Sequence, residues 1–138
     1  MRNPHVIGAR VYLRPLERAD AATLQPWFND PEVCEHLAIR RPASLAFEEA
    51  FLAGLEGDEH RVVLGIALRD GDALIGTTGL EDIDFVNRHA QFGIAIGARA
   101  LWGQGHGSEV AALMVRHAFQ HLNLNRVWLH VYESNARG

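Results

Sequence analysis

The sequence predicts one α+β domain in which a mixed, mostly antiparallel sheet carries helices on both faces. Residues 61–96 have the pattern of three strands joined by hairpins, a long amphipathic helix follows at about 107–121, and an alternating strand comes after it at 125–132. The chain has 138 residues, of which 48% are hydrophobic and 22% charged. That length supports one core and is too short for two, so we expect a single domain over residues 1–138.

The first element is a strand within "HVIGARVYLRPL", where apolar and polar residues alternate up to Pro15. A helical pattern begins at Ala19 and continues to Trp27, and Pro26 is expected to end or bend that helix. The segment "NDPEVCEHL" predicts a turn and a short helix with Asp30 as its N-cap. A further helix is expected from Leu45 to Leu55, with Ser44 as its N-cap and Gly57 closing it.

The middle of the chain is rich in β-branched and aliphatic residues and is interrupted by two groups of turn residues, "RDGD" and "FVNRHA". This pattern predicts strands at Arg61–Leu68, Ala73–Asp84 and His89–Ile96. In the later helix, Val110, Met114, Ala118 and Leu122 form one apolar stripe, flanked by Ala111 and Val115. Three tryptophans (Trp27, Trp102 and Trp128) and Phe28 are expected to be packing anchors.

The stretch "WGQGHGSE" places glycines at 103, 105 and 107 immediately before that helix. A helix N-terminus leaves about four main-chain N–H groups without partners and carries roughly half a positive charge. Glycines allow positive φ and remove the Cβ atoms that would keep an anion away. We therefore expect a phosphate or pyrophosphate at Gly103–Ser108, and the alternative is a flexible loop before an ordinary helix.

Two familiar phosphate motifs do not match this stretch. A Walker loop requires Gly-Lys-Ser/Thr, and no lysine is present here. A Rossmann fingerprint requires G-x-G-x-x-G in the first strand-turn-helix unit, whereas this G-x-G-x-G follows a run of hairpins. A different kind of phosphate-binding fold is therefore indicated.

The segment "FGIAIGARALWGQGHGSEVAALMVRHAF", followed by "LNLNRVWLHVYESNARG", resembles the GNAT superfamily of N-acetyltransferases. It is most similar to the branch of the RimJ- and RimL-like ribosomal-protein N-terminal acetyltransferases and the spermidine acetyltransferases. Supporting likenesses are "VYLRPLERADA", "FNDPEV" and "VNRHAQFGI", so that the resemblance covers nearly the whole chain. The glycine turn corresponds to the family's Q/R-x-x-G-x-G/A motif, with Trp102 in the Q/R place.

The resemblance implies that the chain binds acetyl-CoA as a co-substrate and transfers its acetyl group to an amine. In the family the pantetheine arm lies beside the strand that corresponds to His89–Ile96, and the pyrophosphate lies on the glycine turn. Carried over to this sequence, the cofactor-binding residues are Ile94, Ala95, Ile96, Trp102, Gly103, Gln104, Gly105, His106, Gly107, Ser108 and Asn135. His106 either assists phosphate binding when protonated or is exposed and passive.

Acetyl transfer to an alkylamine is helped by a general base, because the amine has a pKa of about 10 and is mostly protonated at pH 7. Several branches of the superfamily use a glutamate at the start of the strand at 89–96, but this chain has Gln91 there. Glu81, Asp82, Asp84 and His89 are possible substitutes, of which we choose Glu81. Strand alternation places Asp82 and Asp84 on one face and Glu81 on the other. The alternative is that these acids are simply solvated.

Compared with the family, the sequence lacks the later helix with its tyrosine general acid and the two strands that follow it. Tyr132 cannot be assumed to replace that tyrosine. The resemblance thus implies a C-terminally truncated domain, whose fifth predicted strand would have an unpaired edge and promote self-association. Two functions remain open: an acetyltransferase acting on a protein N-terminus, polyamine or other small amine, and an acyl-CoA-binding pseudoenzyme or interaction module. Glu32 and Glu35 favour a cationic acceptor.

Composition excludes several other classes. A net charge of -4 without a basic block argues against nucleic-acid binding. A single cysteine, Cys34, excludes an internal disulfide, and no signal peptide or membrane span is evident, so we expect a cytoplasmic protein. His117 and His121 have the i, i+4 spacing of metal ligands, but the other ligands of a zinc site are missing and no metal is expected.

Overall fold

The computed structural model describes residues 1–34 and 43–129. The strands in this part of the chain are β1 (Val6–Ile7), β2 (Val11–Pro15), β3 (Val62–Leu68), β4 (Leu74–Asp84), β5 (His89–Ile96) and β6 (Arg126–Trp128). The helices are the 3-10 turns η1 (Arg18–Asp20) and η2 (Arg99–Leu101) and the α-helices α1 (Ala21–Phe28), α2 (Pro31–Cys34), α3 (Leu45–Leu55) and α4 (His106–Gln120).

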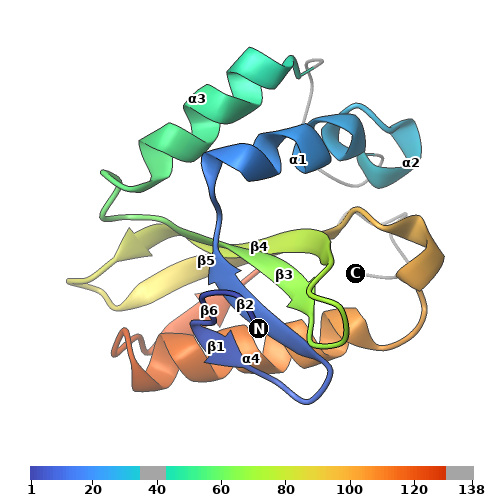
Figure 1. Cartoon of the computed structure of the whole chain (residues 1–138). Coiled ribbons are helices and arrows are strands. Elements are labelled where there is room, and N and C mark those ends of the chain that lie inside the picture. Colours follow the sequence, from blue (N-terminus) through green and yellow to red (C-terminus); the bar gives the residue numbers. More distant parts are fainter. Residues whose placement is uncertain (35–42, 130–138) are drawn as a thin grey trace.

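The strands form one sheet in the order β1-β2-β3-β4-β5-β6. Neighbouring strands are antiparallel except β5 and β6, which are parallel. Helices α1, α2 and α3 lie over one face of the sheet and α4 lies over the other (Figure 1). The predicted α+β class, with a mixed and mostly antiparallel sheet between helices, is confirmed.

The main core lies between the sheet and α4. It contains buried residues of β2 to β5 together with four residues of the helix, Val110, Leu113, Met114 and Ala118. The predicted apolar stripe is therefore largely right, although Leu113 contributes to it and Val115 is 36% exposed. A smaller cluster on the opposite face joins α1 to α3 around Ala21, Leu24 and Leu52, and Trp27 and Phe28 pack against it. The core thus fixes α4 along the underside of β5, with its N-terminus close to the end of that strand.

Most predicted boundaries agree with the structure to within a residue or two. The Ser44 hydroxyl caps α3 by accepting from the Phe47 N–H at 3.0 Å, and Asp30 accepts from the Glu32 N–H at 2.9 Å at the start of α2. Helix α1 contains Pro26 and continues to Phe28. Because Pro26 lies near the helix end, its missing N–H removes only one late hydrogen bond.

The predicted single first strand is wrong, because the segment is a hairpin. Val6 pairs with Leu13 and Ile7 with Tyr12, and the Gly8 N–H donates to the Val11 carbonyl at 2.8 Å to close the turn. The first arm, β1, is only two residues long, so the sequence pattern does not reveal the reversal. The fifth predicted strand is β6, which ends at Trp128; residues 130–132 of that prediction lie outside the described residues.

Candidate functional site

The glycine turn joins η2 to α4 and has the predicted left-handed backbone. Gly103 has φ 77° and Gly105, the N-cap residue of α4, has φ 82°. A residue with a Cβ rarely adopts these angles, so both positions require glycine. Gly107, by contrast, lies inside the first helical turn. Two of the three glycines therefore shape the turn, and the helix starts one residue before its predicted beginning.

The first turn of α4 presents main-chain donors. The first intrahelical bond runs from the Glu109 N–H to the Gly105 carbonyl at 3.2 Å, and the N–H groups of residues 106–108 precede it. Open space lies beside Gly103 and Gly107: a methyl group added at Gly103 would meet nothing within 4 Å, and one at Gly107 would only touch Ile94 Cδ1 at 4.0 Å. Ser108 is exposed in the same turn. These properties suit an anion bound against the main chain.

The end of β5 borders this turn and has a free edge among the described residues. Strand β6 pairs only with His89, Ala90 and Gln91 of β5. In an antiparallel ladder the N–H and C=O of one residue point to the same side, and successive residues point to opposite sides. The Gly97 N–H donates to the Ile75 carbonyl of β4 at 2.9 Å, so odd-numbered residues of β5 face β4. The main-chain groups of Ile94 and Ile96 therefore face the side on which β6 has ended.

This geometry separates the three residues that the resemblance places along the cofactor arm. Ile94 presents its main-chain groups at the free edge. Ile96 lies on the same edge, but its carbonyl accepts from Trp102 Nε1 at 2.7 Å. Ala95 pairs with Thr77 of β4 and its main chain faces that strand, so the expectation that it hydrogen-bonds an arm at this edge does not fit the geometry. The Trp102 side chain thus occupies the edge of β5 at Ile96.

Two contacts fix the segment between β5 and η2 to the helices above it. A methyl group added at Gly97 would overlap the Trp27 ring, so the tryptophan of α1 packs directly on this glycine. Arg99 forms ion pairs with Asp30 at 3.2 Å and with Glu32 at 2.6 Å. Because Glu32 is already paired, it is a weaker candidate for attracting a cationic acceptor; Glu35 lies outside the described residues.

Arg10 and Glu109, which the sequence reasoning missed, support the glycine turn through hydrogen bonds. Arg10 Nη1 donates to the Gln104 carbonyl at 2.7 Å, and Arg10 Nε donates to Glu109 Oε1 at 3.0 Å. Glu109 Oε2 accepts from the N–H groups of Arg10 and Val11 at 2.9 and 3.1 Å. Burial of Glu109 favours the neutral acid, but these N–H groups and the Arg10 guanidinium outweigh it and lower the pKa.

His106 is 6% exposed, so the expected alternative of an exposed and passive histidine is wrong, and assistance to phosphate binding stays a prediction. Its Nδ1 lies 3.5 Å from the Leu101 carbonyl oxygen, so the ring packs beneath the turn. The imidazole therefore packs against the residues of the turn. The main-chain N–H of His106 is one of the donors in the first turn of α4. Gln104 is exposed and its side-chain amide donates to the Ala100 carbonyl at 3.2 Å.

The candidate base, Glu81, is exposed and lies directly opposite Gln91 in the β4–β5 ladder. One extra residue in β4 shifts the register between Glu81 and Asp84, and Asp82 takes a positive φ of 50°. A bulge of this kind reverses the facing of the residues that follow it. Glu81 and Asp84 consequently share the face of Gln91 and His89, and the expected grouping of Asp82 with Asp84 is wrong.

Asp84 organises the β4–β5 turn. Its carboxylate accepts from the Val86 and Asn87 N–H groups at 2.9 and 2.8 Å and from Asn87 Nδ2 at 2.9 Å. The bonds from Asn87 are the main cause of its lowered pKa, and a carboxylate that is stabilised in this way is a weak base. Its Oδ2 also lies 3.7 Å from His89 Nε2. Of the acids in this cluster, Glu81 and Asp82 remain exposed.

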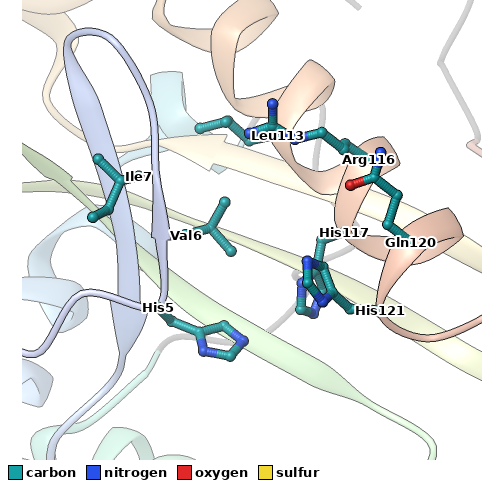
Figure 2. Close-up of a pocket in the computed structure, with 8 residues that line it drawn as sticks. All are labelled: His5, Val6, Ile7, Leu113, Arg116, His117, Gln120 and His121. Carbon is teal, nitrogen blue, oxygen red and sulfur yellow. The ribbon is translucent and has the colours of Figure 1, made fainter.

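The other half of α4 carries the two spaced histidines. His117 is 7% exposed, and its ring lies 5.1 Å from that of His5 and 5.3 Å from that of His121. These rings line a groove of about 460 Å³ between β1 and α4, together with Arg116 and Gln120. Figure 2 shows how the lining side chains are arranged. Burial, with repulsion from His5 and His121, lowers the pKa of His117. The described residues contain no group of three side chains arranged to hold a metal ion.

Two further expectations fall outside the part of the chain that the structure describes. Asn135, the expected cofactor contact near the end of the fifth predicted strand, and Tyr132 both belong to residues 130–138. A helix long and apolar enough to cross a membrane is not found among the described residues.

Comparison with known proteins assigns the chain to a family. Residues 10–137 match the family described as the acetyltransferase (GNAT) domain. Over 131 residues the chain is 32% identical to p20 of Bacillus licheniformis, named an uncharacterised N-acetyltransferase; the match covers 91% of this chain and 72% of that protein.

Solved structures agree with this assignment. The spermidine N-acetyltransferase of Vibrio cholerae, in complex with CoA and spermine, superposes with a TM-score of 0.80 at 25% identity, covering 88% of this chain and 71% of that one. A structure described as a putative acetyltransferase from T. thermophilus gives a TM-score of 0.77 at 28% identity, with coverages of 96% and 69%. The chain thus belongs to the acetyltransferase (GNAT) domain family and is an N-acetyltransferase.

Proposed function

We propose that this protein transfers the acetyl group of acetyl-CoA to a primary amine at the junction of β5 and the glycine turn. The observation that carries the proposal is the placement of the N-terminus of α4 beside the end of β5, whose edge at Ile94 has no partner strand within residues 1–34 and 43–129. The V. cholerae relative is described with CoA and spermine bound, which supports both the acetyl donor and an amine acceptor. The finer assignment, to the RimJ/RimL-like and spermidine acetyltransferase branch, is part of this proposal.

The residues present fit the diphosphate of acetyl-CoA. Gly103 and Gly107 leave room against the main chain, and the N–H groups of residues 106–108 supply donors at the positive end of a helix. The pantetheine arm would lie along the edge of β5 at Ile94. In that position the Ile94 N–H would donate to the thioester oxygen as negative charge develops there.

The reaction forms a C–N bond, breaks the thioester C–S bond and moves one proton from the amine to the leaving sulfur. Gln91, in the place of the family's glutamate, has no basic group. Glu81 is exposed and pairs directly with Gln91 across the ladder, so both side chains lie on the same face of the sheet. We assign Glu81 as the base that accepts the amine proton, directly or through water.

Gln91 also favours a second candidate, an acyl-CoA-binding pseudoenzyme or interaction module. Calorimetric titration with CoA, together with thiol release over a panel of polyamines, peptides and other amines, separates the two functions. Acetyl transfer predicts CoA binding and thiol release with at least one amine. CoA binding without release over the whole panel would support the module, and absence of CoA binding would contradict both.

Two expectations about the protein as a whole stay predictions. Self-association through β6, which is the last strand of the sheet among the described residues, can be measured by light scattering. A clean, stable monomer would contradict it. A cytoplasmic location likewise rests on the sequence alone.

A further inference from the structure

Arg10 connects two parts of the molecule that are far apart in the sequence. It lies in the turn between β1 and β2, and its guanidinium reaches both sides of the Gly105 N-cap: Nη1 donates to the Gln104 carbonyl at 2.7 Å and Nε donates to Glu109 Oε1 at 3.0 Å. A methyl group added at Gly105 would lie 3.2 Å from Arg10 Nη2, which confirms how closely the side chain follows the turn.

Glu109 completes this link from the helix. One carboxylate oxygen takes the Arg10 side chain and the other accepts from the main-chain N–H groups of Arg10 and Val11 at 2.9 and 3.1 Å. Only 16% of its side chain is exposed, compared with 49% for Arg10. Because Glu109 is anchored to the main chain of β2, it holds the guanidinium in place and balances its charge.

The bond to the Gln104 carbonyl has a directional consequence. In a trans peptide the C=O and the following N–H point in opposite directions. Capture of the Gln104 oxygen by Arg10 therefore turns the Gly105 N–H away from β2. Gly105, which follows this peptide, has φ 82° and no Cβ to limit its φ, so the peptide is easily rotated. Its orientation thus depends on an outside contact.

We propose that Arg10 is a positioning residue of the acetyl-CoA site: it fixes the 104–105 peptide so that the Gly105 N–H joins the donors that bind the diphosphate, while Glu109 orients Arg10. This inference rests on the proposed function, since it assigns a role within the same site. It also explains why an arginine close to the turn need not itself bind phosphate, because Glu109 already engages its guanidinium.

The test measures binding of CoA by calorimetry, and of pantetheine, which lacks the diphosphate, by NMR titration. The variants are Arg10→Met and Glu109→Gln, with Arg69→Met as the matched control. Arg69 Nη1 donates to the Gly8 carbonyl at 3.0 Å. It therefore stabilises the same β1–β2 hairpin through a contact that does not involve the glycine turn. Arg10→Met is expected to weaken CoA binding about ten- to hundredfold, the usual effect of losing charged hydrogen bonds, and to leave pantetheine binding unchanged.

Glu109→Gln distinguishes positioning from direct phosphate contact. If Arg10 positions the turn, this variant weakens CoA binding several-fold and Arg10→Lys restores part of the affinity lost in Arg10→Met. If Arg10 instead binds phosphate directly, removing the competing carboxylate tightens CoA binding, which would overturn the proposal. Equal losses for CoA and pantetheine, or a loss in Arg69→Met as large as in Arg10→Met, would also overturn it. A parent protein that binds CoA no better than pantetheine would contradict the proposed site itself, independently of Arg10.

Discussion

The two ends of α4 both carry conspicuous sequence patterns, and the structure treats them in opposite ways. At the N-terminus, glycines expose main-chain N–H groups to open space, and charged side chains around them are paired with one another. Toward the C-terminus, the buried ring of His117 packs against the exposed rings of His5 and His121. The glycine turn leaves main-chain donors available to a ligand, whereas the imidazole of His117 is covered by its neighbours.

This difference shows which features indicate a binding site. From the sequence, the glycines are a candidate phosphate turn, whereas His117 and His121 have metal-ligand spacing but lack the other ligands of a metal site. The distinguishing property is the surroundings: the turn has room for a ligand and donors with no intrahelical partner, whereas His117 is 7% exposed and the residues lining its groove include no carboxylate. Substitutions at each end of the helix test this difference.

The largest effect is expected from Gly105→Glu, which should reduce CoA affinity by about a thousandfold or more, corresponding to roughly 4 kcal/mol. The substitution places a carboxylate at the N-terminus of α4, where it would repel the diphosphate and occupy its site. The measurement is calorimetric titration with CoA, with circular dichroism to confirm the fold.

Gly105→Ala is the matched control for backbone strain. It also forces a Cβ onto φ 82°, at a cost of about 1–2 kcal/mol, but introduces no charge. We expect it to bind CoA with a modest loss. Retained affinity in Gly105→Glu would refute the placement of the diphosphate at this end of α4.

A second test concerns the place of the reaction, which we propose to lie beside the end of β5. Glu81→Gln removes the proposed base and should lower kcat about a hundredfold near neutral pH, within the usual range for general-base catalysis. Affinity for CoA should not change, because Glu81 lies on β4 opposite Gln91, away from the glycine turn. The measurement is thiol release with an amine accepted by the parent protein.

Asp82→Asn is the control for Glu81→Gln, since Asp82 is the next residue in the bulge and is also exposed. It should leave kcat close to that of the parent, because Glu81, the proposed base, is retained. If the two variants behave in the reverse order, the base is Asp82. If neither changes kcat, the proton leaves the amine by another route.

The sequence was sufficient for the features that depend on local pattern. Helix α3, strand β5 and the left-handed turn at Gly103 and Gly105 follow from capping, alternation and glycine chemistry, and the structure agrees with them. The Ser44 cap illustrates why: its bond to the Phe47 N–H involves residues three positions apart, which is within the range of a sequence pattern.

Features that depend on distant partners were missed. The bulge at Asp82 is defined by the register of β4 against β5, and alternation within β4 does not show it. The bond between Arg10 and Glu109 joins residues 99 positions apart. The reversal between Val6–Ile7 and Val11–Pro15 is likewise visible only when the arms pair. In each case a contact made after chain reversal decides the local structure.

The smallest expected effect concerns the histidine end of α4 and appears in stability rather than in CoA binding. Burial lowers the pKa of His117 from its ordinary 6.5, with repulsion from His5 and His121 adding to the effect, and Arg116 adds a further positive charge to the groove. The unfolded chain therefore binds more protons than the folded one as pH falls below 6.5, and the free energy of unfolding decreases. Well above that pH both states are neutral at this residue and the contribution vanishes.

His117→Leu should accordingly flatten the dependence of the free energy of unfolding on pH between about 7.5 and 5.5, measured by urea denaturation. Each unit by which the pKa is lowered corresponds to about 1.4 kcal/mol of stability lost at low pH. Asp84 and Glu109 do not contribute to the pH dependence in this range. Because their pKa values are lowered, their protonation reduces the free energy of unfolding only near and below the ordinary pKa values of 3.8 and 4.5. An unchanged slope would show that the histidine contact is not the source of acid sensitivity. A change in CoA affinity at the upper end of that pH range would show that the two ends of α4 are coupled, so that buried His117 and the open turn could no longer be treated as independent.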